Sequence, residues 1–323
     1  MNNKHTTSGK VFRMNPGTLK KLETNFSNKI NTDLYKVSSP DLLEETYLFT
    51  NEDALKLQFC PWITSNSGLT TYSLRASEMF LKIFFEQHKE ELQQINPESF
   101  CDLVPLSGSL YYKISEAFYK VFNRALPQAF IGVRRNFRDN HWVADISYRN
   151  VDSLPEKPFL IIGDTIATES TLFAILHEIK REVEHIEGIA IFSIASGLPG
   201  ARLVSKMEKI FGGTPIFLYQ TNALFGLMEN GTDMPWLHPE TITTEAMRKR
   251  AIENYGEYLA EKWCTINDWG ERCNSSSKYL DTLTETIKRY QTFNIDDLTK
   301  RKLNYFLEKT KEEKERILHP LSI

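Results

Sequence analysis

Long apolar runs, cysteines and excess charge are all scarce in this sequence of 323 residues, and each shortage argues against a class of protein. No apolar run approaches the roughly 20 residues that a membrane-spanning helix needs. The 4 cysteines, Cys60, Cys101, Cys264 and Cys273, are widely scattered and form no CxxC pair, which argues against a structural zinc site and for reduced thiols. A formal net charge of −3 predicts no general attraction to nucleic acid or to an anionic membrane. The segment 1–10 lacks the apolar core of a signal peptide, so we expect a cytoplasmic protein.

Glycine-rich nucleotide motifs are absent as well. Neither G-x-G-x-x-G nor G-x-x-x-x-G-K-[ST] occurs in the sequence. Their absence argues against a dinucleotide-binding enzyme and against a P-loop enzyme. The composition itself is ordinary for a globular protein, with 41% hydrophobic and 25% charged residues. A chain of this length can bury a full core and hold one large domain or two smaller ones.

Strands and helices alternate in the middle of the chain. This alternation predicts an α/β fold with a mainly parallel sheet flanked by crossover helices. A further strand is expected to form an antiparallel flap or hairpin, at 142–148. The expected parallel strands are 103–106, 129–133, 159–162, 189–195 and 215–219, and the expected helices are 69–92, 110–122 and 171–183.

The two ends of the chain differ from this middle part. Residues 1–65 are polar and rich in turn signals, and they are expected to add short helices and loops to the core. Residues 66–240 form the expected α/β core. Residues 241–323 are expected to form a helical extension, because their apolar positions follow helical spacing among many charges.

The segment 159–172 has the pattern of a phosphosugar site. A buried strand is followed by Asp164, then by a hydroxyl-rich turn with Thr168, Ser170 and Thr171, and then by a helix. Backbone N–H groups at a helix N-terminus suit a phosphate, and the acid at the strand end can accept hydrogen bonds from ribose hydroxyls. The alternative is an ordinary strand-to-helix turn capped by a serine or threonine.

This segment resembles the loop that binds phosphoribosyl pyrophosphate (PRPP) in type I phosphoribosyltransferases. That loop has an apolar strand, two acids and a turn similar to Thr-Gly-Gly-Thr. Gly163 occupies the first acidic position and Asp164 the second. Glu169 and Ser170 stand where the family has small residues. The residues that fit well are Thr165, Ile166, Ala167, Thr168 and Thr171.

Four other segments resemble the uracil phosphoribosyltransferase branch, in the same order along the chain. They are similar to its helix opening, its pyrophosphate loop, its arginine segment before a flexible flap, and the segment that leads into its base loop. The resemblance covers about residues 66–240. The segments are Thr70–Arg75, Val104–Leu110, Gly132–Asn136 and Gly226–Pro235.

The departures from the family pattern bear on the acceptor. Trp236 and His238 replace two glycines of the base loop, so we expect a reshaped pocket in which the indole stacks on a heterocycle. Ser107 stands at the position of the family's arginine. The alternatives are that Trp236 packs against the C-terminal helices and that His238 is a simple loop residue. Trp263 and Trp269 are expected to be packing residues.

The resemblance implies an enzyme that uses PRPP with Mg²⁺ and a small heterocyclic acceptor, as a homodimer, with the metal held mainly through substrate oxygens. It implies catalytic roles for Asp164 and Arg135. The implied PRPP-binding residues are Ser107, Gly108, Ser109, Arg134, Thr165, Ala167, Thr168, Glu169, Ser170 and Thr171. The implied acceptor-binding residues are Met234, Pro235, Trp236, Leu237 and His238.

Catalysis would rest on positioning and on stabilising the charge of the leaving pyrophosphate, under a flap formed by residues 136–150. Arg134 and Arg135 have an ordinary alternative as surface ion pairs. Three other functions stay open: transfer to a heterocycle other than uracil, a non-catalytic regulator that kept the fold, and an unrelated nucleotide enzyme. The missing first acid and the presence of Glu169 favour the regulator.

Overall fold

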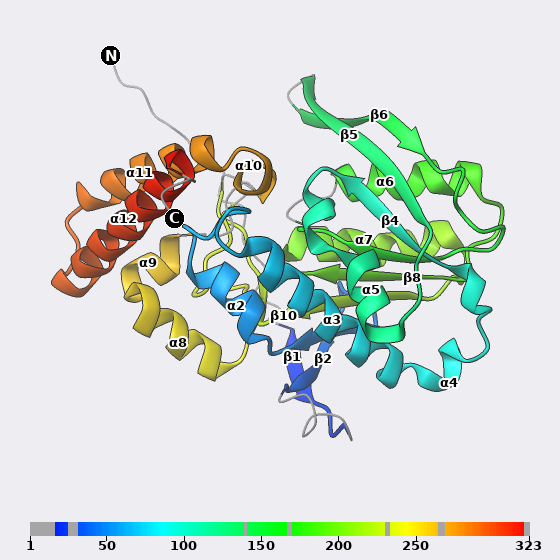
Figure 1. Ribbon diagram of the computed structural model, residues 1–323. Coiled ribbons are helices and arrows are strands. Elements are labelled where there is room, and N and C mark those ends of the chain that lie inside the picture. Colours follow the sequence, from blue (N-terminus) through cyan, green and yellow to red (C-terminus); the bar gives the residue numbers. More distant parts are fainter. Residues whose placement is uncertain are drawn as a thin grey trace, which may run out of the picture.

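The computed structural model describes residues 17–24, 32–138, 141–166, 170–229, 233–263 and 269–319. A large sheet with helices on both faces forms one side of the molecule, and the C-terminal helices gather beside it (Figure 1).

Nine strands of the described residues form the large sheet, in the order β1-β2-β3-β10-β8-β7-β4-β5-β6. The six strands from β3 to β5 in this order are parallel. The strands β1 and β2 at one edge and β6 at the other are antiparallel to their neighbours. The predicted mainly parallel sheet is therefore confirmed. The strands are β1 (Thr18–Lys21), β2 (Leu34–Ser38), β3 (Thr46–Phe49), β4 (Phe100–Leu106), β5 (Gln128–Arg138), β6 (His141–Asn150), β7 (Phe159–Gly163), β8 (Gly188–Ser193) and β10 (Ile216–Thr221).

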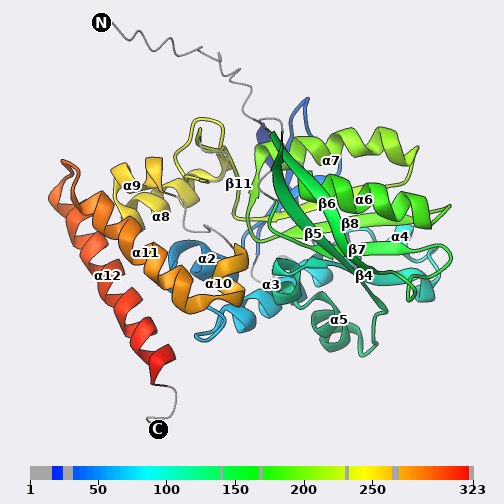
Figure 2. The ribbon, with the colours of Figure 1, turned by 90° about the horizontal axis from the view of Figure 1, so that it is seen from above.

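Helices bury both faces of the central strands. In β7, Phe159 and Ile161 belong to one apolar cluster and Leu160 and Ile162 to the other. This burial on both sides explains why the strand is a continuous apolar run. Figure 2 shows α6 and α7 over one face, with α3 and α5 on the opposite side. The bounds are α3 (Leu69–Gln87), α4 (Lys89–Leu92), α5 (Ile114–Phe122), α6 (Ser170–Glu182) and α7 (Leu198–Phe211), with short 3-10 turns η1 (Pro97–Ser99) and η2 (Gly108–Tyr112).

The N-terminal segment corrects one prediction. We expected short helices and loops over residues 1–65, but in the described ranges 17–24 and 32–65 β2 and β3 extend the sheet and α2 (Glu52–Phe59) is the one helix. All four residues of β3 are buried and pair in parallel with β10. Asn51 caps α2, since its side chain accepts a hydrogen bond from the Ala54 N–H at 2.7 Å. This part of the extension is thus built into the α/β core.

The C-terminal helices confirm the predicted helical extension. An aromatic cluster holds them together, with Trp263 packed against Tyr255, Tyr290 and Phe306. The helices are α8 (Glu245–Tyr255), α9 (Glu257–Lys262), α10 (Trp269–Asn274), α11 (Ser276–Gln291) and α12 (Asp297–Leu318). A small sheet connects them to the core, formed by β9 (Ser196–Gly197), β11 (Ala223–Phe225) and β12 (Ile242–Thr243). Within the described ranges, none of the helices combines the length and the apolar character that crossing a bilayer demands.

Candidate active site

The strand order marks one point of the sheet as a candidate site. Along the chain the core strands are β4, β5, β7, β8 and β10, but in the sheet β5 lies on one side of β4 and β7 on the other. The connections that leave β4 and β7 therefore run in opposite directions. In open parallel sheets, ligands bind in the crevice beyond the carboxyl ends of the strands at such a switch point. The loops that follow β4 and β7 meet there.

The loop after β4 is tied directly to the end of β7. It contains Ser107, Gly108 and Ser109, at the start of η2. The peptide bond between Leu106 and Ser107 is cis. Ser109 is buried, and its hydroxyl donates a hydrogen bond to the carbonyl of Gly163. The predicted pyrophosphate loop and the predicted sugar-binding acid are thus brought together.

Asp164 lies immediately beyond the last residue of β7, as predicted. Its backbone N–H donates to the Phe192 carbonyl of β8 at 3.0 Å, and its Oδ1 accepts from the Thr165 N–H at 2.8 Å. The carboxylate is held in a fixed position at the strand end. Ser170 begins α6 and Thr171 is half-buried. The predicted phosphate-binding residues Ala167, Thr168 and Glu169 and the side chain of Ser170 lie outside the described residues.

Gly163 has no room for the acid that the family has at this position. A Cβ on Gly163 would lie 2.7 Å from Tyr112 Cβ and 2.9 Å from Ile114 Cγ1. Tyr112 is completely buried, and its hydroxyl lies 2.7 Å from Thr165 Oγ1 and accepts from the Ile194 N–H at 3.1 Å. Burial raises the pKa of Tyr112 above its ordinary value. A neutral phenol therefore packs over the strand end beside Asp164.

The helix α10 adds residues that the sequence did not indicate as part of the site. Trp269 was expected only to pack, and its ring does pack against Tyr112 with centroids 5.6 Å apart. Its Nε1 also donates to the Gly108 carbonyl at 3.1 Å, and Asn274 Nδ2 donates to Ser107 Oγ at 2.8 Å. These contacts join residues more than 160 positions apart, so local sequence patterns carry no signal for them.

The base loop contradicts the prediction for Trp236. Its side chain is 1% exposed and lies between Phe59 of α2 and Phe225 of β11, with each ring centroid 5.0 Å from the indole. The indole has no open face on which a heterocycle can stack. Met234 is also buried, and the Leu237 N–H donates to the Ala260 carbonyl of α9 at 2.9 Å. Trp236 is thus a buried packing residue, but its ring contacts lie on α2 and β11, and the C-terminal helices hold the backbone of the loop.

His238 belongs to the same packed loop and contacts Pro235 and Glu240. The Glu240 N–H donates to its Nδ1 at 3.2 Å, and its own N–H donates to the Pro235 carbonyl at 3.4 Å. Its ring covers Gly226, where a Cβ would lie 1.9 Å from Nδ1, so this position requires glycine. Burial lowers the pKa of His238, which favours the neutral ring. The structure supports a loop role for this histidine.

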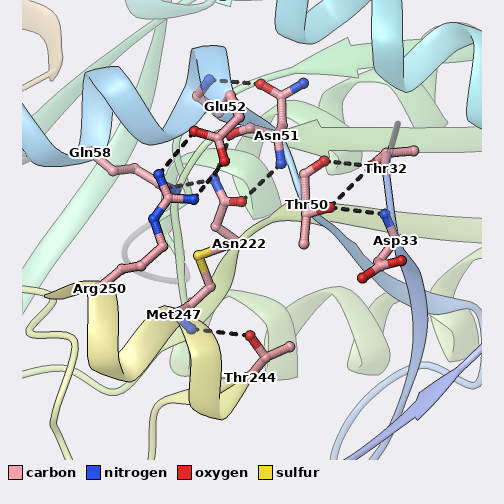
Figure 3. A network of polar contacts seen from close by, with 11 residues as sticks. Thr32, Asp33, Thr50, Asn51, Glu52, Gln58, Asn222, Thr244, Met247 and Arg250 are labelled. Atoms are coloured by element: carbon pink, nitrogen blue, oxygen red, sulfur yellow. Dashed lines mark hydrogen bonds and ion pairs between the residues drawn. The ribbon is translucent and has the colours of Figure 1, made fainter. Parts of the chain in front are cut away.

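A buried amide network closes the carboxyl ends of β8 and β10 (Figure 3). Asn222 accepts from the Asn51 N–H at 2.9 Å and donates to Gln58 Oε1 at 2.9 Å. Gln58 Nε2 in turn donates to the Ile194 carbonyl at 2.6 Å. All four of these residues are buried, so α2 fills this part of the sheet edge. The candidate site for a substrate is therefore the neighbouring ends of β4 and β7.

A two-stranded ribbon overhangs the same edge of the sheet. The last pair between β4 and β5 joins Leu106 and Gly132, whereas β5 and β6 continue together beyond it (Figure 1). The predicted hairpin strand is thus confirmed as β6. Arg134 is exposed on this ribbon, opposite Asp145 in the register. The side chain of Arg135 lies outside the described residues, so its catalytic role stays a prediction.

Part of the chain resembles several solved structures. No family model matches the chain, and no curated protein sequence matches it. Among solved structures, a protein from Aquifex aeolicus is 17% identical over 56% of this chain and 86% of that one, with a TM-score of 0.40. A purine phosphoribosyltransferase from Pyrococcus horikoshii is 15% identical over 47% of this chain and 82% of that one, with a TM-score of 0.28. An adenine phosphoribosyltransferase from Thermoanaerobacter pseudethanolicus is 14% identical over 46% and 84%, with a TM-score of 0.29.

Each of these likenesses covers about half of the chain. The architecture follows from the strand order and strand directions of this chain itself. The candidate site follows from the residues at the ends of β4 and β7. The chain is accordingly an α/β protein whose candidate active site lies at the β4/β7 switch point.

Proposed function

We propose that the chain is a phosphoribosyltransferase, which moves ribose 5-phosphate from PRPP to a planar heterocyclic acceptor and releases pyrophosphate. The observation that supports this most is the meeting of two loops at the β4/β7 switch point. One loop offers Asp164, a few residues before α6 begins at Ser170, and the other offers the backbone of 107–109. The distinct parts of PRPP, a phosphate, a ribose and a pyrophosphate, match these elements one by one.

In this proposal the 5′-phosphate binds the turn 167–171 at the start of α6, where backbone N–H groups and hydroxyls favour a dianion. Asp164 accepts hydrogen bonds from the ribose hydroxyls. Pyrophosphate binds the loop 107–109, and Arg134 and Arg135 of the overhanging ribbon approach it when the ribbon closes. Thr165, whose N–H donates to Asp164 Oδ1, lies next to the ribose in this proposal.

The reaction replaces one bond at C1 of the ribose by another. The C1–O bond to pyrophosphate breaks, a C1–N bond to the acceptor forms, and the acceptor nitrogen loses its proton to solvent. Magnesium, when bound, would neutralise charge on the leaving group. Asp164, a half-buried carboxylate, is a suitable oxygen ligand for it, and the remaining hard oxygens would come from PRPP. The protein contributes position and dipoles aimed at the developing charge.

Burial of Trp236 changes the proposed acceptor. The indole is enclosed by Phe59 and Phe225, so a heterocycle cannot stack on it. Trp236 therefore gives no reason to expect an acceptor other than uracil. Uracil therefore becomes the first acceptor to test, followed by other pyrimidines, purines and unrelated heterocycles. A homodimer remains part of the proposal.

A second function has one observation in its favour. Tyr112 and Ile114 fill the space where the family's first acid would stand, and Gly163 is the residue that this packing allows. A protein that binds PRPP or a nucleotide without turning it over would tolerate that loss. This alternative is a non-catalytic regulator that kept the fold.

The deciding experiment measures pyrophosphate release from PRPP and Mg²⁺ across the acceptor panel, together with PRPP binding in the absence of an acceptor. Release that requires one acceptor supports the transferase. Tight PRPP binding without release from any acceptor favours the regulator. Absence of both binding and release contradicts both functions.

A further inference from the structure

The helix α10 holds the candidate pyrophosphate loop at two successive residues. Trp269, its first residue, donates from Nε1 to the Gly108 carbonyl at 3.1 Å. Asn274, its last residue, donates from Nδ2 to Ser107 Oγ at 2.8 Å and accepts from the Tyr111 hydroxyl at 3.0 Å. Both ends of one short helix therefore bind the same loop.

The direction of these hydrogen bonds matters for an anion. Trp269 and Asn274 donate to the loop, so they engage its oxygens. In a planar trans peptide the N–H points opposite to the C=O. Because the Gly108 carbonyl points toward Trp269, the N–H of Ser109 points away from α10. The oxygens of pyrophosphate accept hydrogen bonds, so the Ser109 N–H, held facing away from the helix, can donate to one of them.

The same helix also reaches the sugar side of the site. The ring of Trp269 packs against Tyr112, whose hydroxyl lies 2.7 Å from Thr165 Oγ1, next to Asp164. The fit at Gly108 is close, since a Cβ there would lie 3.0 Å from Trp269 Cδ1. A buried guanidinium anchors α10 from behind: Arg272 donates to the carbonyls of Leu57, Cys60 and Ile63 at 2.7–3.0 Å.

We propose that α10 is a part of the active site, in which Trp269 and Asn274 are positioning residues that orient the amides of 107–109 toward a pyrophosphate group. This inference rests on the proposed function, because it assumes that pyrophosphate binds this loop. It assigns a role to the C-terminal extension, which the resemblance to phosphoribosyltransferases does not cover. The site is complete only when α10 is seated on the loop.

The test uses a matched pair of tryptophan substitutions in the full-length protein. Trp269→Phe keeps a ring against Tyr112 and removes the N–H that binds Gly108. Trp263→Phe makes the same change in a buried tryptophan whose Nε1 has no hydrogen-bond partner among the described residues. Calorimetry with Mg²⁺ then measures the affinity of each protein for inorganic pyrophosphate and, separately, for ribose 5-phosphate.

We expect Trp269→Phe to weaken pyrophosphate binding roughly three- to tenfold, which is the loss of affinity expected when one hydrogen bond is removed. Ribose 5-phosphate binding should not change. Trp263→Phe should change neither affinity. The ratio of the two affinities is the informative quantity, because general loosening of the fold lowers both. Equal pyrophosphate affinity in wild type and Trp269→Phe, or an equal loss for both ligands, overturns the inference.

A second variant covers the case in which Trp269→Phe does not fold. Asn274 is exposed, so Asn274→Ala removes its hydrogen bond to Ser107 with little risk to the core. It should also weaken pyrophosphate binding selectively, and unchanged binding counts against the inference. If wild type binds ribose 5-phosphate but Asn274→Ala and Trp269→Phe leave pyrophosphate affinity intact, the proposed function stands and only the role of α10 fails. If wild type binds neither ligand, the proposed function fails as well.

Discussion

The proposed function gives Asp164 a chemical role beside its structural one, and one substitution tests the two separately. Its Oδ1 accepts the Thr165 N–H at 2.8 Å, and an asparagine oxygen keeps that hydrogen bond. The charge that would orient the ribose in the proposed reaction is lost. We therefore expect Asp164→Asn to lower kcat/KM at least ~100-fold, with the unfolding midpoint close to wild type.

The matched control for this change is Asp281→Asn. Asp281 forms an exposed ion pair with Lys314 on the C-terminal helices, away from β7. Activity and stability should both stay near wild type there, since exposed pairs contribute under about 1 kcal/mol. Wild-type turnover in Asp164→Asn would place the sugar elsewhere.

Asp102 makes stability depend on pH. It is buried in β4, accepts from Gln128 Nε2 at 3.0 Å and accepts from the backbone of Ser115 at the start of α5. Burial raises its pKa from 3.8 to about 7. Between these values the folded protein binds more protons than the unfolded chain, so this contribution is complete below pH 3.8 and is lost as the pH rises through 7.

Asp102→Asn should remove this dependence. Urea unfolding of wild type and variant at a series of pH values gives the difference in unfolding free energy. We expect wild type to lose stability relative to the variant, by on the order of 1–4 kcal/mol between pH 4 and pH 8. A difference that stays constant with pH would contradict the raised pKa. Taking the difference removes the opposite contribution of Glu45, whose pKa is lowered in the folded protein.

At the scale of elements, the anchoring of α10 depends on Arg272. Its guanidinium is fully buried and donates to the carbonyls of Leu57, Cys60 and Ile63, at the end of α2 and in the turn beyond it. Arg272→Met keeps much of the side-chain volume but leaves these carbonyls without that donor. We expect a loss of on the order of 3 kcal/mol in the free energy of unfolding, measured by urea titration.

Arg289→Met is the control for that experiment. Arg289 lies beside the ring of Tyr290 on α11, with its guanidinium carbon 5.8 Å from the ring centroid. Its loss should cost less than about 1 kcal/mol. Similar losses in the two variants would mean that the buried carbonyl contacts contribute little.

The sequence revealed the central parallel strands, which helices cover on both faces, and the edge hairpin strand β6. The strand that holds Phe159 to Gly163 is a continuous apolar run between turn signals, which is a local pattern. The four residues Thr46–Phe49 are too few for such a pattern, and their pairing with β2 and β10 identifies them as a strand. Local patterns therefore predicted the centre of the sheet but not its N-terminal edge.

In the candidate site, too, some residues were predicted from local patterns and others were not. Asp164 and the loop 107–109 follow strands directly, so the sequence placed them at the sheet edge. Trp236 could be placed in its loop, but its orientation depends on Phe59, which is distant in the sequence. The contact between Gly108 and Trp269 joins residues 161 positions apart. Side-chain direction and long-range contacts come from the packed structure.

At the scale of the whole molecule, one continuous apolar cluster joins the two sides. It includes Phe59 of α2, Phe80 of α3, Tyr219 of β10, Trp236 and Phe306 of α12. Because the sheet and the C-terminal helices share this cluster, we expect them to unfold together. Tryptophan fluorescence, which reports mainly on the helical side, and far-ultraviolet circular dichroism should give the same midpoint in urea. Two separated transitions would show that the helices are an independent unit.

The pairing of β3 with β10 has a consequence for synthesis on the ribosome. Thr46 lies beside Leu218, so β3 leaves the ribosome long before its parallel neighbour exists. Until residues 216–221 emerge, β3 has one unpaired edge and four apolar or β-branched side chains that the finished protein buries. Unpaired strand edges of this kind recruit other chains. A translation product that stops before residue 216 is therefore a candidate for aggregation, while completion of a few more residues supplies the strand that covers this edge.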